Sequence, residues 1–305
     1  MYWNEIFVYY CMIPIAWVMA SVGNILGLIV FSKKSMIKIG PVYAYRILFL
    51  SDQFFLPLFI NSFTTQAFGK ELIIYSDIGC KIYYFLNYAT VNWGPMMIVY
   101  ISAEKLVSIR YPAKRFLLRK KKSQIIYFII IIIFYALINI PSLFYYEIKT
   151  NEILNLNQTI ATYKTCTYKD SFSQQLLSLV YLFTKVLIPF SLMTTCSVFL
   201  IISVFKLRQR IIRNFLSTTN QLQSDAINKY KKDFRLAVTS LLMNLIYLVL
   251  NAPLPIFLSL LNSLNNYYFL WVVVNLCYFS FSVNFYLILL TNHLTRKEFF
   301  NIFKK

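Results

Sequence analysis

Long runs without Asp, Glu, Lys or Arg recur along this chain, and they restrict its fold more than any other feature. One run covers 82–103 and another covers 236–295. Each is long enough to cross the roughly 30 Å hydrocarbon core of a bilayer, which takes about 20 apolar residues in a helix. Only 13% of the residues are charged, against about 25% in soluble domains. We therefore expect an integral membrane protein without a separate soluble domain.

Apolar runs of this length predict seven transmembrane helices. Their approximate ranges are 7–31, 47–68, 82–103, 125–146, 173–205, 236–261 and 267–290, and the Asn-rich segment 262–266 separates the last two. A secretory signal peptide is the alternative for the first run, but that run is longer than the usual apolar core of about 7–15 residues and lacks a basic leader. We expect one all-α domain over residues 1–305, a seven-transmembrane-helix bundle with a short amphipathic eighth helix at about 294–303.

Lys and Arg are distributed unevenly among the connecting loops. The loops after the first, third and fifth runs and the tail are basic, whereas the loop after the second run holds only two lysines, Lys70 and Lys81. Basic loops stay in the cytoplasm, so we expect the amino terminus outside and the carboxyl terminus inside. The net charge of +19 is then a topological signal that also attracts anionic membrane lipid. A nucleic-acid-binding patch is the rival interpretation, and we expect no nucleic-acid partner.

The cysteines separate according to this topology. Cys80 stands at the outer end of the third run and Cys166 in the longest outer loop. Both lie where a disulfide persists, and we expect them to be bonded. The sequon at Asn157 in the same loop predicts glycosylation. The other three cysteines fall inside spans and are interpreted as buried apolar residues.

An acid and a base, Glu104 and Lys105, end the third run. Lys105 follows Cys80 by 25 residues and precedes Pro112 by seven. Seven spans, an outer amino terminus and this spacing resemble the rhodopsin-like (class A) G protein-coupled receptors, in which an acid-Arg-Tyr triplet ends the third helix. The resemblance covers nearly the whole chain. It implies a cell-surface receptor in the plasma membrane that is activated by an extracellular ligand and signals through heterotrimeric G proteins.

Positions that match the family's activation motifs carry several departures. Lys105 replaces the Arg, and the resemblance implies that it pairs with Glu104, with Asp233 at the inner end of the sixth span, or with both. The alternative is that these are solvated interface charges. Asn284 matches the family's seventh-helix Asn-Pro-x-x-Tyr motif, but Phe285 replaces the Pro and Ile288 replaces the Tyr. Normal coupling is therefore in doubt.

A polar cluster inside the bundle is also implied by the resemblance. It comprises Asn24, Asp52, Ser280 and Asn284. In the family the Asp binds sodium with help from neighbouring polar groups, but Gly94 stands where the family often has Ser. We therefore expect a hydrated cluster with at most weak sodium affinity at Asp52, and no organic cofactor.

The variant seventh-helix motif resembles invertebrate FMRFamide and related neuropeptide receptors, which favours a peptide ligand. Asn87 occupies the position where aminergic receptors need an acid, so an amine ligand is disfavoured. Lys185 is an intramembrane base that either meets a ligand carboxylate or extends to the outer interface. Asn251 stands where the family has a ligand-sensing Trp. The aromatic candidates for the pocket are Tyr84, Tyr88 and Trp271, for which a membrane-interface belt is the alternative.

Channels, secondary transporters and receptor-like proteins that do not signal also place several helices in a bilayer. A secondary transporter usually contains internal repeats with interrupted helices, and no such repeat is found in the sequence. A membrane channel, or a non-signalling protein that keeps the receptor fold, stays compatible with the same apolar runs. The sequence resembles no enzyme, because it contains one His and no span with paired carboxylates.

Overall fold

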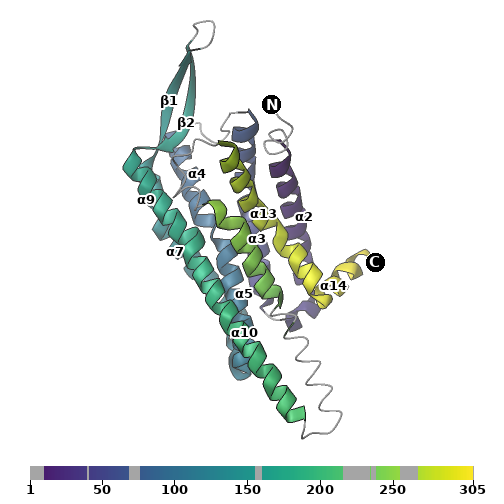
Figure 1. The fold of residues 1–305 in the computed structure, drawn as a ribbon. Coiled ribbons are helices and arrows are strands. Elements are labelled where there is room, and N and C mark those ends of the chain that lie inside the picture. The colour runs from purple at the N-terminus through teal and green to yellow at the C-terminus, as the bar shows by residue number, and fades with distance from the viewer. Residues whose placement is uncertain are drawn as a thin grey trace.

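The computed structural model describes residues 10–39, 41–68, 76–154, 160–215, 234, 238–254 and 267–304. Long helices run beside one another as a bundle, with a β-hairpin projecting from one end (Figure 1). We call this the hairpin end, and the opposite end the basic end. The first two helices, α2 (Met12–Phe31) and α3 (Val42–Phe68), pack against each other, and α2 also packs against α13 (Tyr267–Thr291).

The third predicted span is two helices rather than one. Helix α4 (Asp77–Thr90) ends in a turn at Val91 and Asn92, and α5 (Trp93–Arg110) continues the chain toward the basic end. The break has a local cause, because Pro95 has no N–H to donate to the carbonyl four residues earlier and Gly94 beside it is a poor helix former. The turn places Gly94 against α3.

The fourth span is a helix, α7 (Lys121–Asn139), that is shorter than the sequence predicted. Pro141 has no backbone N–H to continue the hydrogen bonding of the helix, and a short helix, α8 (Ser142–Tyr145), leads into the hairpin. Helix α7 exposes a row of large apolar side chains, namely Ile126, Ile130, Ile133 and Leu137. An apolar row of this kind on the outside of a bundle suits contact with lipid.

The loop after α7 is a β-hairpin, which the sequence analysis did not predict. Strands β1 (Tyr146–Leu154) and β2 (Ile160–Tyr168) are antiparallel, with Tyr146 opposite Tyr168 and Ile148 opposite Cys166. The strand sequences are rich in Tyr, Ile and Thr, which favour extended backbone. The hairpin therefore follows from the local β-strand propensity of these residues, which apolar runs alone do not reveal.

The fifth span contains a change of helical type. Helix α9 (Ser171–Tyr181) passes through a π-helical turn, Leu182–Leu187, into α10 (Ile188–Phe215), which packs against α5. A further helix covers Val238–Asn251, and after α13 the helix α14 (His293–Phe303) turns away from the bundle (Figure 1). Lys33 forms an ion pair with Glu298 of α14, at 3.5 Å between Nζ and Oε2.

Four described segments are individually long and apolar enough to cross a membrane, namely Met12–Phe31, Lys121–Tyr145, Ser171–Lys206 and Val272–Thr291. The predicted class, an all-α bundle of seven membrane helices, is confirmed. Its core is a cluster of buried apolar side chains contributed by several helices, including Phe31, Phe49, Met97, Tyr135 and Phe285.

Candidate functional site

A cavity of about 300 Å³ lies between the helices near the hairpin end. Half of its lining residues are aromatic, and Lys185 is its only charged lining residue among those that the structure describes. The lining residues are Phe55, Tyr84, Asn87, Tyr88, Val91, Tyr181, Lys185, Leu254, Val274, Cys277, Tyr278 and Phe281. The predicted pocket candidates Asn87, Lys185, Tyr84 and Tyr88 thus face one cavity.

The base of the hairpin is fastened to α4 beside this cavity. Cys80 and Cys166 form the expected disulfide, with their Cα atoms 5.8 Å apart. The ring of Tyr146 stacks on that of Tyr84, with centroids 3.9 Å apart, and its hydroxyl lies 2.8 Å from that of Tyr88. Tyr84 and Tyr88 therefore line the cavity and support the hairpin at the same time.

The remaining two pocket candidates are placed differently. Asn251 is buried, its Nδ2 donates to the backbone oxygen of Tyr247 at 3.0 Å, and it is not among the described residues that line the cavity. Trp271 lies on α13, but its side chain is outside the described part of the structure, as are Asn157 and Asp233.

Asp52 and Asn284 meet in the middle of the bundle. Nδ2 of Asn284 donates to Oδ2 of Asp52 at 2.8 Å, whereas Oδ1 of Asp52 has no hydrogen-bond partner among the described residues. That oxygen lies against Gly94, where an added Cβ would overlap with it. A serine would therefore displace the carboxylate, and Gly94 explains how α5 approaches α3 so closely.

The other two members of the predicted polar cluster, Asn24 and Ser280, have different surroundings. Asn24 is buried, and its amide has no hydrogen-bond partner within the described part of the chain, as expected of a group that contacts water or a cation. Ser280 instead donates to the backbone oxygen of Cys277 at 2.7 Å and approaches Asn251 at 3.5 Å. Asp52 and Asn24 thus each keep a buried oxygen without a hydrogen-bond partner among the described residues, whereas Ser280 is committed elsewhere.

Glu104 is the centre of an ionic cluster at the basic end. Its carboxylate is fully buried and contacts Nζ of Lys105 at 3.1 Å, Nε of Arg119 at 2.6 Å and Oγ of Ser108 at 2.7 Å. The contact with Lys105 was predicted from the sequence as one alternative, but the contacts with Arg119 and Ser108 were not. Ser108 stands one helical turn after Glu104, a spacing that predicts such a contact. Nothing in the sequence singles out Arg119 among its basic neighbours.

A second network, also missed, joins three helices in the half of the bundle nearer the basic end. The hydroxyl of Ser102 on α5 lies 2.7 Å from that of Ser240 and donates to Oδ1 of Asn244 at 3.3 Å. Nδ2 of Asn244 donates to Oγ of Ser197 on α10 at 2.7 Å. These bonds hold the helix Val238–Asn251 to α5 and α10.

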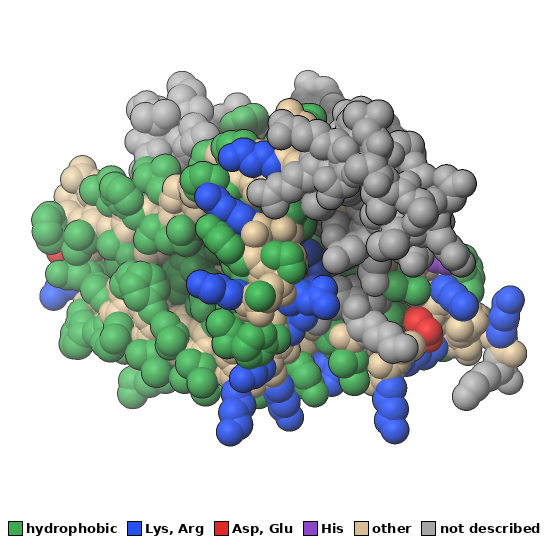
Figure 2. All heavy atoms as spheres, turned by 90° about the horizontal axis from the view of Figure 1, so that it is seen from below, with side chains coloured by type: hydrophobic (Ala, Val, Ile, Leu, Met, Phe, Trp, Pro, Cys, Tyr) green, Lys and Arg blue, Asp and Glu red, His purple; other side chains and the backbone are tan. Residues whose placement is uncertain are grey.

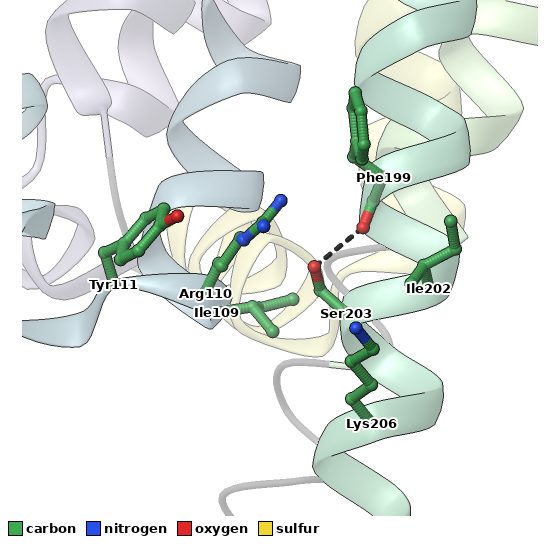
Figure 3. Close-up of a pocket in the computed structure, with 7 residues that line it drawn as sticks. All are labelled: Ile109, Arg110, Tyr111, Phe199, Ile202, Ser203 and Lys206. Atoms are coloured by element: carbon green, nitrogen blue, oxygen red, sulfur yellow. Dashed lines mark hydrogen bonds between the residues drawn. The ribbon is translucent and has the colours of Figure 1, made fainter.

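A cavity of about 420 Å³ opens at the basic end between α5 and α10 (Figure 3). Arg110 and Lys206 supply two cations to its wall, and Phe199 and Ile202 supply apolar surface. The Arg110 guanidinium lies 5.9 Å from the centroid of the Phe199 ring. Figure 2 shows this end of the molecule, where Lys and Arg side chains project from a largely hydrophobic surface. The surface suits a partner with acidic and apolar groups.

The pattern of the 7 transmembrane receptor (rhodopsin family) matches residues 23–292 of this chain. The chain belongs to the rhodopsin family of seven-transmembrane receptors. A comparison with curated proteins returns no match. The protein is thus a multi-pass receptor of the plasma membrane.

This receptor accommodates its departures from the family motifs by packing. Phe285, which replaces a Pro, is buried with its ring centroid 6.1 Å from that of Phe49 and 6.0 Å from that of Phe299. Ile288, which replaces a Tyr, is also buried. The variant residues therefore link α13 to α3 and α14 by apolar contact, where the family motif has a Pro and a hydroxyl.

Proposed function

We propose that this receptor binds an extracellular peptide and signals through heterotrimeric G proteins. In this proposal the amino terminus and the hairpin end face the outside, and the basic end faces the cytoplasm. The uneven distribution of Lys and Arg among the loops supports that orientation. The variant motif at Asn284 and Phe285 favours a ligand of the FMRFamide-like neuropeptide class.

The hairpin beside an aromatic cavity is the observation that carries the peptide part of the proposal. Within the described residues β1 and β2 form a two-stranded sheet, so each has an outer edge. Such an edge presents backbone N–H and C=O groups to which an extended peptide can add as a further strand. The aromatic rings of the cavity below then offer a site for one or two of its side chains.

The cavity between α5 and α10 supports the coupling part of the proposal. Its cations attract an acidic partner, while Phe199 and Ile202 offer apolar contact to a helix laid against them. Lys105 is a point charge in place of the family's planar guanidinium. We therefore expect coupling that is weaker than is usual in the family.

Cells that express the receptor, screened against an amidated-neuropeptide library with several G protein reporters, test the proposal. We expect at least one peptide to give a saturable reporter response that parental cells lack. An epitope tag at the amino terminus should be stained by antibody on intact cells.

The matched control is the double variant Arg110→Gln and Lys206→Gln, which keeps the hairpin end unchanged. It should bind the active peptide normally and give a reduced reporter response. Peptide binding without any reporter response would indicate a receptor that does not signal. Ion or solute flux through purified protein in liposomes, without any peptide response, would favour a channel or transporter.

A further inference from the structure

Lys185 is a buried cation at the level of the hairpin-end cavity. It lies in the π-helical turn Leu182–Leu187, and only 2% of its surface is exposed. Turns of this type are rare and frequently occur at functional sites. The hydroxyl of Tyr247 donates to the backbone oxygen of Lys185 at 2.7 Å, which anchors this residue to the helix Val238–Asn251. The side chain is therefore held inside the bundle and does not extend to the membrane interface.

The described partners of the Lys185 ammonium are neutral. Nζ donates to the hydroxyl of Tyr181 at 2.5 Å and hydrogen-bonds with the thiol of Cys277. The thiol in turn donates to the backbone oxygen of Leu250, at 3.6 Å between Sγ and O. An ammonium group has three N–H donors, so two are directed to neutral acceptors. Among the described residues the third N–H has no further acceptor, and Lys185 lines the cavity.

The described wall of this cavity contains no acid to balance that charge. Asn87 adds an amide with two further donors, and the remaining lining residues are aromatic or aliphatic apart from Cys277. Asp52, an acid of the bundle interior, is already bonded to Asn284. A buried charge without an opposite charge is strongly unfavourable. A ligand that brings an anion into the cavity removes this cost.

We propose that Lys185 is an anion subsite, and that the ligand places a carboxylate against its ammonium group and an adjacent aromatic or apolar group against the tyrosine rings. The inference rests on the proposed role of the cavity as the ligand site. It restricts the ligand to one that carries a carboxylate, because an amidated terminus is neutral and cannot balance the charge of Lys185. The carboxylate comes from an acidic side chain or from a free carboxyl terminus.

Two pairs of probes test the subsite without the natural ligand. The first pair is 3-phenylpropionate and its neutral amide, 3-phenylpropanamide, and binding to the purified full-length receptor in lipid nanodiscs is measured from the dependence of Tm on probe concentration. We expect the acid to bind roughly tenfold to a hundredfold more tightly than the amide, as a hydrogen bond between charged groups allows. The second pair, N-acetylphenylalanine and N-acetyl-Asp-Phe-amide, distinguishes a terminal carboxylate from a side-chain carboxylate.

Two variants assign any preference to Lys185. Lys185→Met should abolish the preference for the acid, whereas Tyr181→Phe, which removes a competing acceptor and keeps the charge, should retain it. Equal binding of acid and amide to the unmodified receptor would overturn the proposal, and so would an acid preference that survives in Lys185→Met. If Lys185→Met does not fold, the acid and the amide are still compared on the unmodified receptor and on Tyr181→Phe. That comparison tests the anion subsite by itself. Acid preference without any response to peptides would reject the proposed peptide function and leave the anion subsite standing.

Discussion

Glu104 illustrates how one buried residue connects two parts of the receptor. Its carboxylate accepts from Arg119, 15 residues further along the chain, and also contacts the adjacent Lys105. Arg119 ends the short helix α6 (Arg115–Arg119) after α5. A buried carboxylate requires such partners, because losing one leaves an uncompensated charge. The cluster thereby ties the chain after α5 to α5 itself.

Replacing Glu104 by Gln should raise ligand-free signalling, because it removes the acceptor charge for both cations while keeping the size of the side chain. Reporter output at matched surface expression measures this. Arg119→Gln serves as the control, since it removes one contact and keeps the pair of Glu104 with Lys105, and should raise the output less. Basal output from Glu104→Gln equal to that of the unmodified receptor would argue against a resting-state lock at this residue.

Asp233 stays a predicted second partner of Lys105. Asp233→Asn should raise basal signalling by several-fold at most, the change that a loss of about 1 kcal/mol produces. The same reporter assay, with a demonstrated agonist response, measures it. An unchanged basal output would reject Asp233 as part of the lock and leave Glu104 as the remaining partner.

Gly94 is a position where one added methyl group should destabilise the folded receptor. Gly94→Ala should lower Tm, because its methyl group would overlap with Oδ1 of Asp52, and overpacking of this kind costs about 1–3 kcal/mol.

For the unmodified receptor we expect Tm in millimolar sodium to differ little from Tm in equal potassium, since Gly94 supplies no side-chain ligand. A large, sodium-specific rise in Tm would contradict weak affinity at Asp52.

At the scale of elements, the start of α9 depends on one exposed carboxylate. Oδ1 of Asp170 accepts from the backbone N–H and from the hydroxyl of Ser173, each at 2.7 Å. These hydrogen bonds lower the pKa of Asp170. The carboxylate therefore stabilises the folded state above about pH 4, near the ordinary pKa of Asp, and this contribution is lost as the pH falls through the lowered pKa.

Asp170→Ala should accordingly lower Tm at neutral pH, because it leaves the first N–H groups of α9 without a cap. Asp170→Asn is the matched control, since Asn caps helices about as well as Asp. Thermal unfolding of both variants at neutral pH measures the effect. Equal Tm values for the Ala and Asn variants would show that the cap does not stabilise the receptor.

At the scale of the whole molecule, the disulfide joins the hairpin to the helical bundle across 86 residues of sequence. Peptide mapping without reduction should recover Cys80 and Cys166 in one linked species. Cys11, Cys196 and Cys277 should be alkylated as free thiols after unfolding. Recovery of Cys80 or Cys166 as a free thiol in correctly folded receptor would contradict the bond.

The sequence by itself determined the class of this protein and its family. Long uncharged runs are decisive because each charged residue inside a bilayer carries a free-energy cost. A helix that crosses the bilayer must therefore be apolar along its whole length, and this is visible in the sequence. The spacing of Cys80, Glu104, Lys105 and Pro112 could likewise be recognised without a structure. The prediction of a rhodopsin-like receptor is confirmed by the family match.

Only the tertiary structure decided which side chains meet. Arg119 is one of several basic residues after α5, and its selection as partner of Glu104 depends on how the chain returns to the bundle. The same holds for Ser280, which bonds to Asn251 and Cys277 instead of completing the cluster at Asp52. Lys185 could be noticed in the sequence, and Tyr181 stands one helical turn before it, but the contact with Cys277 brings in a different helix, α13. Such pairings depend on distances of a few ångströms between helices, which hydrophobic periodicity does not encode.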